Sequence, residues 1–241
     1  MDINDMLSSD QVQEAITELI PDVVAIDGNM SIQVISTAIT HASSCKAYVV
    51  YEPTSIPKCT KILSALALAE DKDKVGSMVH VVTPNQLELR RMAEFALQLG
   101  LVKDVPADDM VAAIHCHELD DSTIRDALTL FPLFPVLIIK LGEKGAAIVG
   151  PSQKDRAKPE LCHIQALIPG SIINCNGAGD SLVGAMLAML HKQNQLFSSE
   201  GNININATDI GDMVRRAQRA SIASLESHRA ISEKLAPELI E

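Results

Sequence analysis

The stretch that decides the fold runs from Asn174 to Leu190 and reads NCNGAGDSLVGAMLAML, a turn of small residues followed at once by an apolar helix. Gly177, Ala178 and Gly179 let the backbone approach a ligand closely, and their N–H groups stand at a helix N-terminus, where the dipole favours anions. Asp180 lies in the same turn, and its carboxylate can accept a proton from an attacking hydroxyl. Because such N–H donors stabilise the charge of a phosphoryl group in transfer, the motif predicts a phosphoryl-transfer site. The simpler alternative is that Asp180 only caps the helix and that the glycines only permit tight packing.

Short apolar runs alternate with helical patterns along the rest of the chain. The runs are continuously apolar, as in strands that are buried on both faces of a parallel sheet. Strands are predicted at 23–26, 47–51, 78–82, 136–140 and 146–149, with a weaker one near 162–167, and helices at 31–42, 57–70, 84–99, 106–116, 121–130, 178–191 and 207–226. The β-α-β order predicts an α/β fold with a doubly wound, mostly parallel sheet flanked by helices. The polar stretch 194–206 is typical of a surface loop rather than a linker, so we expect a single domain over residues 1–241.

Polar residues follow the ends of the predicted strands. Asp27 and Asn29 come after the first strand, Glu52 ends the second, and Asn85 and Glu88 follow the third. Ligands of open α/β sheets bind at the carboxyl ends of the strands, so we expect these side chains to line the ligand site. Asn85 and Glu88 are three residues apart at the start of a helix, and capping of that helix is the alternative role for them.

Composition and charge restrict the partners of the protein. The 20 basic and 31 acidic residues give a net charge of −11, which repels nucleic-acid backbones, and no Trp accompanies the two Tyr and four Phe as a base-stacking platform. No apolar run approaches the ~20 residues of a membrane span, and the acidic start MDINDMLSSD is neither a signal nor a transit peptide. The five cysteines are widely spaced and include no CxxC, as in reduced cytosolic proteins. We therefore expect a cytoplasmic protein that binds small molecules, with no nucleic-acid or membrane partner.

Three motifs together resemble the ribokinase-like family, also called the phosphofructokinase-B (pfkB) carbohydrate kinase family. The family's second signature matches NGAGDS at 176–181, its Asn-x-x-Glu motif matches TPNQLE at 83–88, and its Leu-Gly-x-x-Gly hairpin matches KLGEKG at 140–145. The motifs occur in the family's order and at its usual spacing, and the similarity covers nearly the whole chain. Within the family the chain is most similar to pseudouridine kinases of the eukaryotic type, because Lys140 stands where many sugar kinases have Thr and because of the residues at 27–29, 51–55, 221–227 and 230–232.

The resemblance implies an ATP-dependent kinase that phosphorylates a primary hydroxyl of a nucleoside or sugar. It makes Asp180 the catalytic base and the amides of residues 177–179 the anion hole for the γ-phosphate. It assigns water-mediated Mg²⁺ binding to Asn85 and Glu88, the nucleotide side to Lys140, Gly142 and Gly145, and substrate contacts to Asp27 and Asn29. The chain has no Gly-x-x-x-x-Gly-Lys-[Ser/Thr] sequence, so it is not a P-loop kinase.

The chain departs from the family pattern in two places. Family members usually open with a strand-and-lid segment that carries Gly-Gly substrate motifs, whereas this chain begins with an acidic helix before the strand at 23–26, so we expect a member that lacks the N-terminal third. Asn174 stands where many members have Asp near a monovalent-cation loop, which leaves K⁺ as an optional cofactor. Two functions stay open: an active kinase, or a weak or inert adenine-nucleotide-binding remnant that serves as an interaction or regulatory module. An oligomer is compatible with either.

Overall fold

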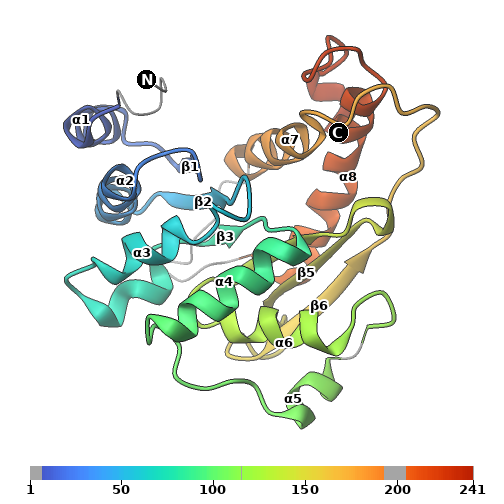
Figure 1. Cartoon of the computed structure of the whole chain (residues 1–241). Coiled ribbons are helices and arrows are strands. Elements are labelled where there is room, and N and C mark those ends of the chain that lie inside the picture. The colour runs from blue at the N-terminus through green and yellow to red at the C-terminus, as the bar shows by residue number, and fades with distance from the viewer. Residues whose placement is uncertain (1–6, 115, 193–204, 241) are drawn as a thin grey trace.

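The computed structural model describes residues 7–114, 116–192 and 205–240 and is built around one six-stranded sheet (Figure 1). Its strands lie side by side in chain order: β1 (Val23–Asp27), β2 (Tyr48–Glu52), β3 (Val81–Val82), β4 (Val136–Lys140), β5 (Ala146–Pro151) and β6 (Pro159–Ile164). Strands β1 to β4 are parallel, whereas β5 runs antiparallel to β4 and β6 runs antiparallel to β5. The predicted α/β architecture, a mostly parallel sheet flanked by helices, is confirmed.

Helices cover both faces of the sheet (Figure 1). One face carries α2 (Ile32–Ser44), α3 (Lys61–Ala67), α4 (Gln86–Gln98) and α6 (Asp121–Leu130), with α1 (Ser9–Leu19) against α2 and α5 (Asp108–Ala113) against α6; the other carries α7 (Ala178–Lys192) and α8 (Ala207–Leu225). Right-handed crossovers between strands that adjoin in chain order place every connecting helix on the same face. The second face is therefore left for α7 and α8, which follow the last strand.

The central strands are buried on both faces, which explains their continuous apolar sequence. In β2, Tyr51 packs into the core beneath α2 to α6, whereas Tyr48 packs into the core beneath α7 and α8. In β4, Leu137 and Ile138 divide in the same way. A strand between two layers of helices has no solvent-facing side, so no polar residue alternates with the apolar ones.

The third strand is shorter than the sequence predicts. Strand β3 contains only two residues, and Lys72–Ser77 before it form a 3-10 helix. The reason lies in His80, whose Nδ1 atom, rather than a backbone carbonyl, accepts a hydrogen bond from the backbone N–H of Val49 at 2.9 Å. The buried imidazole also stacks on the ring of Tyr48, with the ring centroids 4.7 Å apart.

Other boundaries differ by a few residues. The helix predicted at 57–70 begins only at Lys61, and the weak strand near 162–167 begins earlier, at Pro159. The predicted polar loop at 194–206 lies almost entirely outside the described residues. All five cysteines are free thiols. In the described part of the chain, no helix has the length and apolar character needed to cross a membrane.

Candidate active site

The carboxyl ends of the parallel strands bring the predicted polar residues to one edge of the sheet. Asp27 pairs in register with Glu52, and the backbone of Asn85 bridges to that of Lys140. Helix α7 runs antiparallel to β1. The evidence is that His191, near the end of α7, lies 3.6 Å from Asp22, which directly precedes β1. The N-terminus of α7, with the GAGD motif, therefore lies at the same end of the sheet as the strand ends.

Gly177 shapes the turn that begins α7. Its φ is +78°, and a Cβ atom there would lie 1.9 Å from the carbonyl oxygen of Ala230, so only glycine fits. The carbonyl of Gly177 accepts the first helical bond, from the N–H of Ser181 at 2.8 Å. Two serines of α8 hold the turn from behind: Ser221 donates to the carbonyl of Ala178 at 2.9 Å, and the hydroxyl of Ser224 lies 2.6 Å from that of Ser181.

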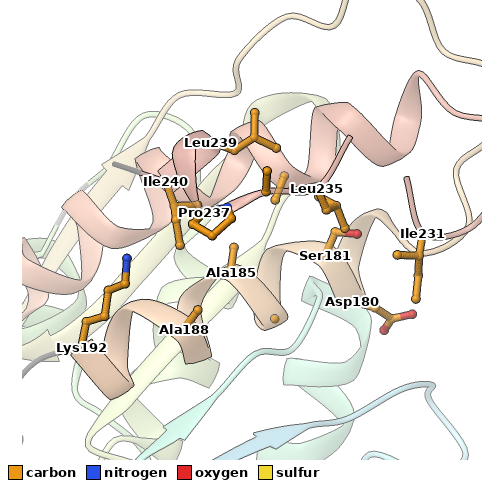
Figure 2. A pocket seen from close by; sticks show the side chains of 13 residues that line it. Asp180, Ser181, Ala185, Ala188, Lys192, Ile231, Leu235, Pro237, Leu239 and Ile240 are labelled. Atoms are coloured by element: carbon orange, nitrogen blue, oxygen red, sulfur yellow. The ribbon is translucent and has the colours of Figure 1, made fainter. Parts of the chain in front are cut away.

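Asp180 lies in the first turn of α7 and is exposed. It is not the N-cap residue, and among the described residues no hydrogen bond or ion pair engages its carboxylate. Asp180 borders a mostly apolar cavity of about 440 Å³ that runs along α7 to Lys192 and is covered by the C-terminal segment (Figure 2). The carboxylate at the mouth of this cavity is thus available to accept a proton from a bound hydroxyl.

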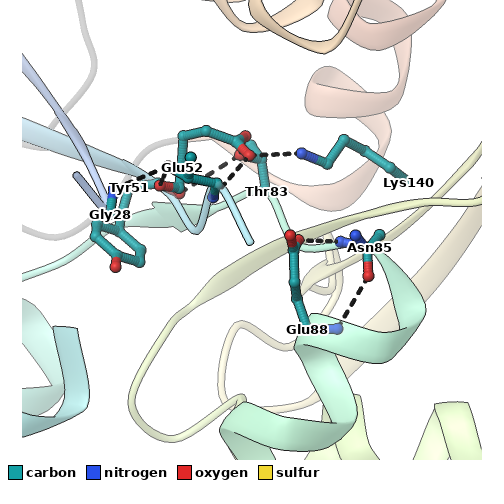
Figure 3. Close-up of polar contacts among 8 residues, drawn as sticks. Gly28, Tyr51, Glu52, Thr83, Asn85, Glu88 and Lys140 are labelled. Carbon is teal, nitrogen blue, oxygen red and sulfur yellow. Dashed lines mark hydrogen bonds and ion pairs between the residues drawn. The ribbon is translucent and has the colours of Figure 1, made fainter. Parts of the chain in front are cut away.

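Asn85 and Glu88 form a reciprocal capping box at the start of α4 (Figure 3). The Asn85 Oδ1 atom accepts from the N–H of Glu88 at 2.9 Å, and the Glu88 Oε2 atom accepts from the N–H of Asn85 at 2.8 Å. The capping role considered from the sequence is therefore present. It does not exclude metal binding, because amide and carboxylate oxygens have further lone pairs and are the ligands that Mg²⁺ prefers, usually with several waters retained. Within the described residues no group of three or more His, Cys, Asp or Glu could hold a metal, so this pair fits only a largely hydrated Mg²⁺.

Lys140 forms an ion pair with Glu52 at the edge of the sheet, with 2.7 Å between Nζ and Oε1 (Figure 3). The second oxygen of Glu52 accepts a hydrogen bond from the Thr83 hydroxyl, and the N–H of Thr54 lies 3.3 Å from Oε1. The side chains of Lys140 and Glu52 are 23% and 17% exposed, so the pair is partly shielded from water. Lys140, predicted on the nucleotide side, is thus engaged by Glu52, which was predicted at the edge of the sheet but not as a partner of Lys140.

The turn after β1 is fixed by its own side chains. The Asp27 carboxylate accepts two hydrogen bonds from Asn29, from the backbone N–H and from the side-chain amide, both at 2.9 Å. The Asn29 amide oxygen accepts in turn from Lys58, and the N–H of Gly28 donates to the carbonyl of Glu52 at 2.9 Å. The two predicted substrate residues therefore lie together, beside the loop that follows β2.

The hairpin between β4 and β5 contains the other two predicted glycines. Gly142 has a φ of +62° and space around its α-carbon. Gly145 has a φ of +91°, and a Cβ atom there would lie 2.0 Å from the carbonyl oxygen of Ile164. The ring of His163 in β6 bonds the carbonyl of Lys144 at 2.8 Å, so β6 supports the tip of the hairpin.

Sequence reasoning gave no supporting role in this site to several residues: Thr83 in the ion-pair cluster, Lys58 behind Asn29, Ser221 and Ser224 on α8, and Ala230 against Gly177. The two serines, three residues apart on a predicted helix, carry a weak signal for one shared face. The other residues give no signal in the chain itself, because their partners lie far away in the sequence.

Comparisons with known proteins give the family and the fold of the chain. The model of the pfkB family carbohydrate kinases matches residues 21–236. A pseudouridine-metabolizing bifunctional protein of Schizosaccharomyces pombe is 23% identical over 202 residues, which are 70% of this chain and 25% of that protein. The ribokinase of Giardia lamblia superposes with a TM-score of 0.60 at 17% identity, over 98% of this chain and 63% of that one. The ribokinase of Arabidopsis thaliana, solved with ribose and ATP, gives a TM-score of 0.58 at 14% identity, over 100% and 60%.

This chain thus spans a quarter of the curated relative and about three fifths of the two ribokinases. The structural likeness establishes the ribokinase-like fold, and the family model spans nearly the whole chain, including the three motifs at the edge of the sheet. The chain belongs to the pfkB family of carbohydrate kinases.

Proposed function

We propose that this chain transfers the γ-phosphoryl group of ATP to a primary hydroxyl of a nucleoside or sugar. The observation that carries the proposal is the exposed Asp180 in the first turn of α7, three residues after the left-handed Gly177. A carboxylate and a set of free helix N–H groups within one turn can accept the proton of a hydroxyl and stabilise the phosphoryl oxygens at the same time.

In the proposed reaction each group has a separate role. Asp180 takes the proton of the acceptor hydroxyl as its oxygen attacks, and the amides of Gly177, Ala178 and Gly179 hold the phosphoryl oxygens. Asn85 and Glu88 would hold hydrated Mg²⁺, which would neutralise part of the phosphate charge. The side chains of Asp27 and Asn29 lie on the acceptor side, and Gly142, Gly145 and Lys140 lie on the nucleotide side.

We further propose a nucleoside acceptor of the pseudouridine type. The support is the weak similarity to a protein whose name describes pseudouridine metabolism, together with residues 27–29 and 51–55 and the lysine at 140. Ribose is the competing acceptor, since one of the structurally similar kinases was solved with ribose and ATP.

Calorimetry and product analysis on this chain test the proposal. We expect Mg²⁺-loaded AMPPNP, a non-hydrolysable ATP analogue, to bind with a micromolar to millimolar Kd. Incubation with Mg-ATP and pseudouridine, uridine or ribose should give phosphorylated product that mass spectrometry detects. Binding without any product would favour the nucleotide-binding remnant, and no binding at several millimolar analogue would refute the nucleotide site.

A further inference from the structure

The Glu52–Lys140 ion pair joins two segments that are 88 residues apart and that have different proposed roles (Figure 3). Glu52 ends β2 and precedes the turn that lies beside the proposed acceptor residues. Lys140 ends β4 and precedes the proposed nucleotide hairpin. The backbone N–H of Lys140 also donates to the carbonyl of Pro84 at 2.8 Å, which places this lysine directly beside the Asn85–Glu88 capping box.

The ion pair leaves hydrogen-bonding capacity on both Lys140 and Glu52. An ammonium group has three donors, and among the described contacts the Nζ of Lys140 gives one, to Glu52. The Glu52 carboxylate also accepts from the Thr83 hydroxyl and is fixed in place by it. Lys140 therefore has donors left for an anion, while the nearby carboxylate competes for the same charge.

The negative charge around Lys140 increases the effect of this competition on anion binding. Glu52, Asp27, Glu88 and Asp180 all lie at this end of the molecule, and the whole chain has a net charge of −11. Partly buried charges interact through an effective dielectric constant of about 20, so a carboxylate within several ångströms weakens anion binding by at least about an order of magnitude. A metal-free triphosphate has about two more negative charges than its Mg²⁺ complex and is repelled more strongly.

We propose that Glu52 is a specificity-determining residue, which restrains Lys140 so that the site accepts a triphosphate loaded with Mg²⁺ and rejects the metal-free form. This inference rests on the proposed function, because it assumes that the phosphates bind beside Lys140. Glu52 acts through charge, without touching the reacting atoms, and Lys140 supplies the cation that an incoming phosphate chain shares with it.

Calorimetry with AMPPNP, in the presence of Mg²⁺ and in its absence with chelator, tests this role. In Glu52→Gln we expect metal-free AMPPNP to bind about tenfold more tightly and Mg-AMPPNP to change by less than about threefold, so the selectivity for the loaded form falls. Lys140→Met should weaken both forms, the metal-free form more. The exposed residues Glu14 and Lys103 provide matched controls, since Glu14→Gln and Lys103→Met change the net charge equally and should leave the selectivity unaltered.

The outcomes separate this inference from the function on which it rests. If the unmodified chain binds no Mg-AMPPNP, the proposed function fails and the inference fails with it. If the unmodified chain binds it and Glu52→Gln leaves the selectivity unchanged, only the inference is overturned. Lys140→Met leaves a partly buried carboxylate uncompensated and can unfold the protein, so the double variant Glu52→Gln/Lys140→Met is measured as well. It should bind metal-free AMPPNP more weakly than Glu52→Gln alone, and equal affinity would count against Lys140 as the phosphate contact.

Discussion

At the scale of single residues, Gly177 and Asp180 have different roles in the small-residue turn at the start of α7. Gly177 is required by the backbone, since its φ of +78° and the neighbouring Ala230 carbonyl leave no room for a side chain. Asp180 is exposed, and among the described residues no hydrogen bond or ion pair engages its carboxylate. Gly179 between them is in open space. The turn therefore contains one structural position and one free functional group.

Substitution of Gly177 by Ala should destabilise the protein, whereas Gly179→Ala should not. The left-handed backbone alone costs alanine about 1–2 kcal/mol, and the Ala230 loop must also move. We expect a Tm lower by about 4 °C or more for Gly177→Ala in thermal unfolding, and an unchanged or slightly raised Tm for Gly179→Ala. Equal Tm values for the two variants would contradict the close approach of the Ala230 carbonyl to this turn.

Asp180→Asn should abolish transfer and spare nucleotide binding. The amide keeps the size of the side chain but cannot take the hydroxyl proton, and loss of a general base typically reduces turnover by about 10²–10⁴-fold. Product formation and the Kd of Mg-AMPPNP are measured on the same preparation. Turnover close to that of the unmodified chain would show that Asp180 is only a first-turn acid that stabilises the helix.

At the scale of elements, the start of α4 depends on a pair of polar side chains and the start of β3 depends on one. In α4 the Asn85–Glu88 box satisfies two backbone N–H groups, so its capping role and its proposed metal-binding role overlap. In β3 the His80 ring replaces a backbone acceptor, and its burial lowers the pKa to about 4. A single substitution can therefore separate helix capping from the proposed metal binding in α4. At His80, a single substitution can separate the hydrogen bond from the titration of the ring.

Glu88→Gln should separate capping from metal binding. Glutamine completes a capping box as glutamate does, so the Tm should change little. The loss of the carboxylate charge should weaken the binding of Mg-AMPPNP about tenfold and leave metal-free AMPPNP unchanged or tighter. Asn85→Ala is the complementary variant, and it should lose about 1 kcal/mol of stability with the cap. If Glu88→Gln binds Mg-AMPPNP normally, Glu88 serves the helix alone.

His80 should make the stability of the protein depend on pH between about 6.5 and 4. The folded protein keeps the imidazole neutral down to a pKa of about 4, whereas the unfolded chain takes up the proton near the ordinary value of 6.5. Protonation therefore favours the unfolded chain, and the free energy of unfolding should fall by up to about 3 kcal/mol as the pH drops through this range. Urea unfolding between pH 7 and pH 4 measures the effect.

The matched variant is His80→Asn, whose amide oxygen can accept the bond from Val49 without titrating. The free energy of unfolding is measured against pH for the unmodified protein and for His80→Asn. Because the other groups titrate in both proteins, the difference between the two curves gives the contribution of His80. It should grow in favour of the asparagine variant as the pH falls. A constant difference would mean that His80 is protonated at the same pH in the folded and unfolded states.

At the scale of the whole molecule, the parallel sheet and the returning α7 bring the proposed anion site and the strand-end residues to one end. The cavity beside Asp180 is bordered by the C-terminal segment, and Asp180 itself is exposed. Water therefore reaches the proposed site of reaction. The chain spans about three fifths of the length of the ribokinases it superposes on.

This chain by itself should therefore release ADP slowly without an acceptor and phosphorylate nucleosides far more slowly than ordinary kinases. Orientation of the reacting groups is worth about 7–11 kcal/mol of barrier, and an open site loses part of it. Coupled ADP release with and without pseudouridine, together with mass spectrometry of the product, measures both rates. Stoichiometric transfer at about 1–100 per second would mean that the turns at 27–29 and 52–55 suffice to hold the acceptor.

The sequence by itself determined the class of the fold, the positions of most strands and helices, and the three motifs. These features depend on patterns within a few residues: continuous apolar runs, capping residues, and glycines before a helix. Asn85 and Glu88 could be paired for the same reason, since three residues of one helix turn set their distance. Asp180 could be placed at the start of its helix, although its exposure could not.

Only the tertiary structure decided which distant residues meet. The ion pair of Glu52 with Lys140 and the hydrogen bond of Val49 to His80 depend on the register of the strands. The contact of Gly177 with Ala230 depends on the packing of the C-terminal segment. The spacing of apolar residues along the sequence shows which face of a helix or strand is buried. It contains no information about which side chain of another element packs against that face. The shortened β3 and the Glu52–Lys140 ion pair both arise from such long-range partners. The fold, and not the motifs, therefore decides which charged groups lie beside Lys140.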